Sequence, residues 1–183
     1  MLPHPDEVEW SSIVNGVETS LSVDSNSILL DVLRDQVGSL GTKRGCDMGT
    51  CGCCSVLVDG EPRLSCLTLA IEVEGSSITT VEGLSDGHHL SPIQQTFREF
   101  GGSQCGFCTP GFLVVISALL SENQRPTDEE IKSAIEGNQC RCTGFQQIVD
   151  SVREASEILV SGISIEDSTL PKSDPHPKYM EDA

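Results

Sequence analysis

Nine cysteines fall into two groups in a chain of 183 residues, and their spacing constrains the fold more than any other feature. The chain has no basic residue before Arg34, so its beginning lacks the charged region of a secretory signal, and we expect a cytoplasmic protein. Disulfides are rare in that compartment. The cysteines are therefore expected to bind metal or to take part in redox chemistry.

The first group has the spacing Cys-x4-Cys-x2-Cys, with a fourth cysteine after eleven further residues: Cys46, Cys51, Cys54 and Cys66. Three ligands in one glycine-rich loop and a fourth from a following element are typical of a plant-type [2Fe-2S] cluster. The glycines let the loop wrap around two irons while its N–H groups point at the sulfurs. Zinc sites usually have paired Cys-x2-Cys knuckles, which this loop lacks. A cluster is therefore favoured over zinc and over inert buried thiols.

The second group consists of two close pairs, Cys105 with Cys108 and Cys140 with Cys142. This spacing suits either another cluster or a tetrahedral zinc ion. Each pair is predicted to precede a helix, at Thr109-Pro110 and at Thr143-Gly144, so that helix N-termini and Arg141 would face the metal. Such surroundings favour the negative charge of an iron–sulfur centre, although the spacing alone leaves zinc open.

The first half of the chain predicts a small α+β unit of four or five short strands and one helix. Asn15-Gly16 and Asp59-Gly60 are turn pairs typical of hairpins, so we expect a strand on each side of both. Residues 78–81 are a further strand candidate, and the unit ends near residue 83. A helix is predicted with its N-cap among residues 25–27 and its end at Gly38. Its apolar positions are Ile28, Leu29, Val32, Leu33 and Val37.

The second half predicts four helices. Capping boxes at Ser91 and Thr127 open two of them, and Thr109-Pro110 opens another. The helices are expected at about 92–100, 109–120, 128–137 and 145–161. The last should present one apolar face, made of Ile148, Val152, Ala155, Ile158 and Leu159.

These patterns predict two domains, at 8–84 and 85–163, followed by an acidic tail at 164–183. The linker at 84–90 contains His88 and His89, which we expect on the surface because cysteines fill all eight ligand places. The tail contains three prolines and five acidic residues, and we expect it to be mostly disordered or laid across a partner. No function is assigned to it.

The charge excludes two classes of partner. Eleven basic and 28 acidic side chains give a net charge of -17, which repels phosphate backbones and anionic lipid surfaces. The longest apolar run, Phe112–Leu120, is less than half of the roughly 20 residues that a bilayer requires. We therefore expect neither nucleic acid nor a membrane as a partner.

Three strings closely resemble the small iron–sulfur subunit of the molybdenum hydroxylases. They are GCDMGTCGCC at 45–54, QCGFCTPGF at 104–112 and GNQCRCTG at 137–144. The family includes xanthine dehydrogenases, aldehyde oxidoreductases, carbon monoxide dehydrogenases and dehydrogenases of N-heteroaromatic rings. The resemblance covers about residues 8–163 and implies an N-terminal β-grasp, ferredoxin-like domain followed by a C-terminal four-helix [2Fe-2S]-binding domain, α+β overall. It also implies a second [2Fe-2S] cluster in place of zinc.

The resemblance implies a role for each cysteine. The outer cluster would lie near FAD on a medium partner subunit, held by Cys46, Cys51, Cys54 and Cys66. The inner cluster would lie beside molybdopterin on a large partner subunit, held by Cys105, Cys108, Cys140 and Cys142. Gln104 and Cys142 would approach the pterin itself. Electrons would then pass from the molybdopterin centre through both clusters to FAD, in a dimer of heterotrimers, with no catalytic residue on this chain.

Two positions depart from the family pattern. Cys53 stands where the family usually has a small residue, so it is either a bystander or a rival to Cys54, and the spacing favours Cys54 as the ligand. Gln139 stands where an apolar residue or proline is common. The alternative functions are a free-standing ferredoxin-like carrier, which would need only the first domain, and a zinc-stabilised interaction module.

Overall fold

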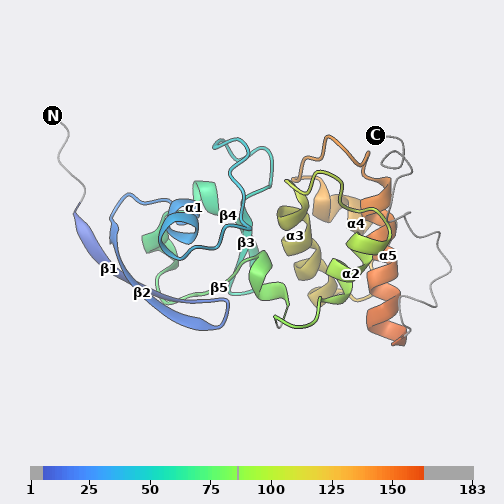
Figure 1. The fold of residues 1–183 in the computed structure, drawn as a ribbon, viewed down its shortest axis with the longest axis horizontal. Helices are drawn as coiled ribbons and strands as arrows, with labels where there is room; N and C mark the ends of the chain where they lie inside the picture. Colours follow the sequence, from blue (N-terminus) through green and yellow to red (C-terminus); the bar gives the residue numbers. More distant parts are fainter. Residues whose placement is uncertain (1–5, 86, 163–183) are drawn as a thin grey trace, which may run out of the picture.

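The computed structural model describes residues 6–85 and 87–162, which form a sheet half and a helical half lying side by side (Figure 1). The sheet half contains β1 (Glu7–Val14), β2 (Val17–Asp24), β3 (Ser55–Val58), β4 (Glu61–Leu64) and β5 (Ser77–Thr79). Their order in the sheet is β2-β1-β5-β3-β4, with β1 and β5 parallel and the other neighbours antiparallel. The α+β class and the ferredoxin-like first half are confirmed.

Both predicted hairpins are present. Asn15 and Gly16 have φ angles of 51° and 80°, and Asp59 and Gly60 have 52° and 89°. Two successive positive φ angles are what a two-residue turn between twisted strands requires. The turn residues therefore identified β1–β2 and β3–β4 correctly.

The last strand is shorter than the sequence predicts. It ends at Thr79, and residues from Val81 form a 3₁₀ helix, η4 (Val81–Leu84). The reason is the side chain of Asn15, which accepts the N–H of Thr80 at 2.8 Å and donates to its hydroxyl at 2.9 Å. These bonds hold Thr80 against the first hairpin turn, so that the backbone hydrogen bonds of β5 to its neighbouring strands end there.

The helix of the sheet half begins without the predicted polar cap. It consists of α1 (Leu29–Asp31) and a π-helical turn, η1 (Val32–Gln36), and its N-cap is Ile28. Ile28 pairs with Leu69 in an isolated β-bridge, so backbone contacts with residues 68–70 fix the helix start in place of a side-chain cap. The helix stops before Gly38, whose φ of 85° ends it as predicted.

The helical half contains the four predicted helices, α2 (Pro92–Glu99), α3 (Thr109–Glu122), α4 (Asp128–Ile135) and α5 (Gln146–Ser161). Capping boxes are present at Ser91 and Thr127. The apolar face of α5 is shorter than predicted, because Leu159 is 38% exposed. Since α5 begins at Gln146, after Phe145 in a left-handed conformation, Cys142 does not directly precede a helix as the sequence suggested.

Each half has its own buried apolar cluster. In the sheet half the cluster surrounds Trp10, whose indole N–H donates to the carbonyl of Ala70 at 2.8 Å. In the helical half it surrounds Phe112, which meets the ring of Phe145 edge-on. His88 and His89 are exposed in the segment between the two halves, as predicted. The predicted tail at 164–183 lies outside the described residues. No helix among the described residues is long and apolar enough to cross a bilayer.

Candidate metal centres

The outer cysteines all belong to the sheet half. Three of them come from the loop between η1 and β3, and Cys66 lies in a short 3₁₀ helix after β4, η2 (Ser65–Leu67). The carbonyl of Cys54 accepts both the N–H of Ser65 at 3.2 Å and its hydroxyl at 2.7 Å. These bonds hold the fourth cysteine beside the loop that carries the other three.

Four thiols line one small enclosed cavity, and they are the four predicted for the outer cluster: Cys46, Cys51, Cys54 and Cys66. Leu30, Arg44, Gly45 and Asp47 complete the lining, and Cys53 does not contribute to it. The thiol of Cys53 is buried beside the cavity without lining it: it lies 3.8 Å from the carbonyl of Cys51 and interacts with the thiol of that residue. This arrangement supports Cys54 and not Cys53 as the outer ligand.

The backbone around this cavity suits a bulky metal group. A side chain at Gly45 would place its Cβ 2.7 Å from the Sγ of Cys51, so only glycine leaves that space open. Gly49 and Gly52 have φ angles of 75° and 69°, which turn the loop around the thiols. The donor set and the turns of the loop therefore fit a [2Fe-2S] cluster with four cysteine ligands.

The outer thiols differ in their surroundings. The hydroxyl of Thr50 and the N–H of Met48 lower the pKa of Cys46 to about 6. Burial raises the pKa of Cys54 to about 12, since that thiol lies among apolar neighbours. Donors aimed at Cys46 would also bond to its sulfur in a metal-bound thiolate, because a thiolate accepts more strongly than a thiol.

The inner cysteines come from two loops of the helical half. Cys108 is the N-cap residue of α3, with Cys105 three residues before it, and the other pair lies between α4 and α5. The thiol of Cys108 interacts with that of Cys140, and the thiol of Cys105 with that of Cys142. The structure thus brings all four predicted inner ligands together.

Thr143 supplies donors to one inner sulfur. Its hydroxyl lies 3.1 Å from the Sγ of Cys140, and its N–H lies 3.4 Å from the same atom. Burial raises the pKa of Cys140, but hydrogen bonds from Thr143, Cys142 and Cys108 together outweigh it, and the net shift of this pKa is downward. Bonds of this kind to cluster sulfurs are among the features that set a reduction potential.

The inner site is open on one side. Cys105 and Cys142 are exposed, Phe107 is 47% exposed, and Gln104 is exposed beside Cys105. The two residues that were predicted to approach a pterin are therefore both at the surface: Cys142 is itself a predicted inner ligand, and Gln104 is the neighbour of another, Cys105.

A hydrogen bond joins the two sites directly. The N–H of Gln139 donates to the carbonyl of Cys51 at 3.0 Å, and Gln139 is followed in the chain by Cys140. An outer cysteine and an inner cysteine are thus separated by one hydrogen bond and one residue. In Figure 1 the loops that carry these residues face each other where the two halves meet.

No three His, Cys, Asp or Glu side chains of the described residues converge as the ligands of a single metal ion would. A binuclear cluster does not need such convergence, because each iron takes only two of the four thiolates.

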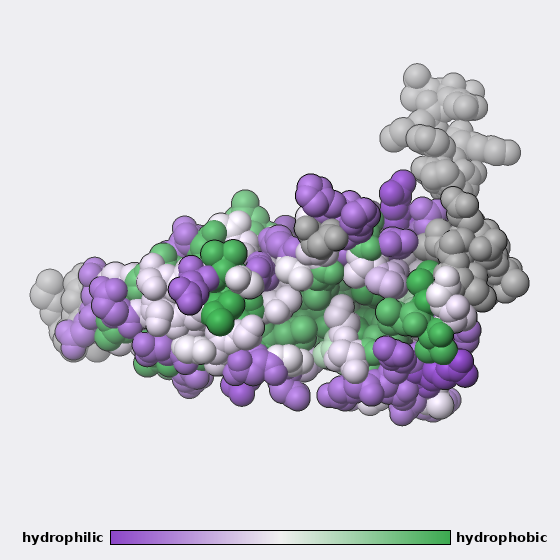
Figure 2. Space-filling model, turned by 90° about the horizontal axis from the view of Figure 1, so that it is seen from below, coloured by the Kyte–Doolittle hydropathy of each residue, from purple (hydrophilic) through white to green (hydrophobic). Residues whose placement is uncertain are grey.

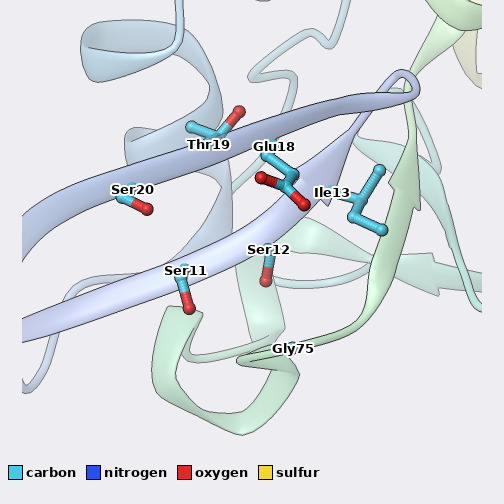
Figure 3. Close-up of a pocket in the computed structure, with 7 residues that line it drawn as sticks. All are labelled: Ser11, Ser12, Ile13, Glu18, Thr19, Ser20 and Gly75. Atoms are coloured by element: carbon cyan, nitrogen blue, oxygen red, sulfur yellow. The ribbon is translucent and has the colours of Figure 1, made fainter.

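Four other hollows of the described surface are lined without a thiol. One lies against β1 and β2 and is lined largely by hydroxyls, including those of Ser11, Ser12 and Thr19 (Figure 3). Another lies in the helical half and is lined by both apolar and polar residues, among them Pro92, Leu120 and Ser121. Figure 2 shows apolar surface on both halves of the molecule. The cysteine loops therefore remain the candidate site.

Sequence reasoning missed three residues at the site. Thr143 was read only as part of a helix start, whereas it binds the sulfur of Cys140. Asn138 and Gly111 lie where the two loops touch, which no local pattern could show, since Asn138 contacts Gly52 across 86 positions of sequence. The signal that the sequence did contain was that all three residues lie within the strings at 104–112 and 137–144.

Comparison with known proteins agrees with this geometry. A family model described as a 2Fe-2S iron–sulfur cluster binding domain matches residues 9–97, and one described as a [2Fe-2S] binding domain matches residues 80–153. The second match favours an iron–sulfur cluster over zinc at the inner site. The chain therefore binds two [2Fe-2S] clusters.

Named relatives extend over nearly the same length. The nicotine 6-hydroxylase small subunit of Paenarthrobacter nicotinovorans is 49% identical over 84% of this chain and 93% of its own. The xanthine dehydrogenase iron–sulfur-binding subunit of Escherichia coli O157:H7 is 41% identical over 84% and 98%. A chain of quinoline 2-oxidoreductase from Pseudomonas putida 86 superposes with a TM-score of 0.81 at 43% identity, over 85% of this chain and 98% of that one. With its two thiol sets in these positions, the chain belongs to the iron–sulfur, electron-transfer subunits of the molybdenum hydroxylase family.

Proposed function

We propose that this subunit carries electrons between a molybdopterin centre and FAD, both held by partner subunits. The proposed outer ligands are Cys46, Cys51, Cys54 and Cys66, and the proposed inner ligands are Cys105, Cys108, Cys140 and Cys142. The observation that carries the proposal is the hydrogen bond from Gln139 to Cys51, which brings the two thiol sets into one continuous structure.

When bound, each cluster supplies a site that takes up and gives up one electron. The chain's own residues provide the rest. Buried walls around Cys51, Cys54 and Cys66 exclude water from the outer site, and the donors of Thr143 stabilise negative charge on the sulfur of Cys140. No residue of the chain is proposed to act on a substrate.

The unequal exposure of the two sites supports an orientation for the partners. The exposed edge with Gln104 and Cys142 would face the molybdopterin of a large subunit, and the outer loop would face the FAD of a medium subunit. The quinoline and xanthine oxidoreductases among the relatives support a multi-subunit assembly. We propose a dimer of heterotrimers in the cytoplasm, with the domain limits at 8–84 and 85–163.

The net charge bears on the partner surfaces. A subunit of charge -17 becomes more negative when it carries clusters with four thiolates each. Docking therefore requires neutral or basic surfaces on the partners. A uniformly acidic contact face on both partner subunits would contradict this part of the proposal.

Coexpression with its large and medium partner subunits tests the function. The expected product is a complex that contains flavin, molybdopterin and, for each copy of this chain, about four irons and four acid-labile sulfides. A chain that is fully loaded but elutes alone would indicate a free-standing carrier. About two irons and one zinc per chain would indicate that the inner site holds zinc, as in an interaction module.

A further inference from the structure

A buried amide lies between the two cysteine loops. Asn138 is 4% exposed, and its side-chain N–H donates to the carbonyl of Gly52 at 3.1 Å. The two residues belong to different halves of the molecule. An amide buried this deeply costs free energy unless its hydrogen bonds are made, so this contact is held firmly in place.

Glycines permit the close approach that this bond needs. A Cβ on Gly52 would lie 2.6 Å from the side-chain nitrogen of Asn138, and Gly52 has a φ of 69°. On the other side, a Cβ on Gly111 in α3 would lie 2.3 Å from the carbonyl oxygen of Gly52 and 2.9 Å from the same nitrogen of Asn138. Asn138, Gly52 and Gly111 therefore form one tightly fitted contact, which we call the amide lock.

The amide lock lies between proposed ligands on both sides. Gly52 directly follows Cys51, and Asn138 is two residues before Cys140. The N–H of Gln139 donates to the carbonyl of Cys51. This bond and the bond of the amide lock therefore join neighbouring residues of the same two loops. A change at the lock would shift one ligand loop against the other without removing a ligand.

We propose that Asn138 is a positioning residue that fixes the separation and orientation of the two clusters. The inference rests on the proposed ligand sets. It assigns to the amide lock a role that general stabilisation of the fold would not supply, namely the magnetic and electronic coupling of one centre to the other.

The test compares Asn138→Ala with the unchanged protein, both as the full chain in its coexpressed complex. After dithionite reduction, two nearby paramagnetic clusters split each other's electron paramagnetic resonance signals at low temperature. We expect Asn138→Ala to retain iron and sulfide but to lose part of this splitting. Hydrogen exchange at the Gln139 amide should also become faster, because its bond to Cys51 opens more often.

Asn123→Ala is the matched control. Asn123 also donates from its side chain, but to Glu130 in the helical half and away from both ligand loops. Its removal should leave the splitting and the exchange at Gln139 unchanged. If the unchanged protein itself lacks two clusters, the proposed function fails and the role of the amide lock fails with it, whereas failure of the lock alone leaves both clusters in the unchanged protein.

Gly111→Ala provides a second route to the same effect. It removes no hydrogen-bonding group but presses a methyl group against the Gly52 carbonyl, so the splitting should again decrease. Loaded Asn138→Ala and Gly111→Ala proteins with unchanged splitting would overturn the proposal. If Asn138→Ala loses its iron, the splitting in the loaded Gly111→Ala protein tests the proposal: a decrease supports it, and unchanged splitting overturns it. Loss of both clusters from both variants would also overturn the proposal, since the lock would then serve cluster assembly.

Discussion

The two cysteine sites of this protein differ in how much of their enclosure the chain supplies. At the outer site, Cys51, Cys54 and Cys66 are 8%, 2% and 8% exposed, Cys46 is partly exposed, and one cavity is lined by all four proposed ligands. At the inner site, Cys105 and Cys142 are exposed, and only the other two thiols pack against the core. The outer site is complete within this chain, whereas the inner site has an open side that a partner subunit would cover.

The largest effect is expected from the ligand choice at the outer site. Cys54→Ala should remove the outer cluster, lowering the iron content from about four to about two per chain, because no other thiol lines that cavity in its place. Cys53→Ala, the matched control, should retain both clusters. Iron analysis and visible spectra check this, and the reverse pattern would assign the ligand role to Cys53.

A difference in cluster lability should follow from the unequal exposure. When the isolated, loaded chain is treated with an iron chelator, the inner cluster should disappear several-fold faster than the outer one, because two of its ligands face solvent. Assembly with the partner subunits should slow the loss of the inner cluster selectively. Paramagnetic resonance of samples reduced at successive times measures both rates. Faster loss of the outer cluster would contradict the conclusion that the chain encloses the outer site more completely than the inner one.

The donors at Cys140 should tune the inner site alone. Thr143→Val removes the hydroxyl that lies 3.1 Å from the Cys140 sulfur, so the reduced, more negative cluster loses stabilisation. A bond worth about 1.4 kcal/mol corresponds to about 59 mV for one electron, and we expect the inner potential to fall by up to that amount.

Redox titration followed by paramagnetic resonance measures this shift. Thr143→Ser keeps the hydroxyl and should restore most of the original potential. The outer potential should not move in either variant. Equal shifts at both clusters would show that the substitution acts through the overall charge or fold and not through one sulfur.

The smallest effect concerns the ion pair that joins α5 to α4 in the helical half. Arg153 donates to Asp128 at 2.8 Å, which lowers the pKa of that carboxyl below its ordinary value of 3.8. The ion pair therefore stabilises the folded state at pH values above the ordinary pKa of this carboxyl. The stabilisation disappears as the pH falls through the lowered pKa of Asp128 in the folded state.

Arg153→Ala should lower the Tm slightly at neutral pH, and the difference should shrink in strong acid. Both groups are solvent-exposed, so the effect is small. Thermal unfolding of the loaded chain over a pH series measures it. A difference in Tm that grows as the pH falls would contradict the sign of this contribution.

Local patterns predicted most of the fold. Turn pairs such as Asn15-Gly16 specify their own backbone angles, and the capping boxes at Ser91 and Thr127 contain both partners within four residues. The helix start at Ile28 and the end of β5 could not be predicted in this way. Both are set by hydrogen bonds to residues about 40 to 65 positions away in the chain.

The same distinction applies to the candidate site. The spacing of Cys46, Cys51 and Cys54 within one loop specified an iron–sulfur site by itself. The exclusion of Cys53 from the cavity depends on which way its side chain points, and the amide lock depends on how two halves meet. Neither property is encoded in a short stretch of sequence.

Spin quantification of the dithionite-reduced, unaltered chain tests the central claim most directly. We predict two distinguishable [2Fe-2S] signals, each integrating to about one spin per chain, because each cluster takes up one electron. A single signal, or fully loaded protein with no paramagnetic centre after reduction, would contradict the assignment of two clusters to these eight cysteines.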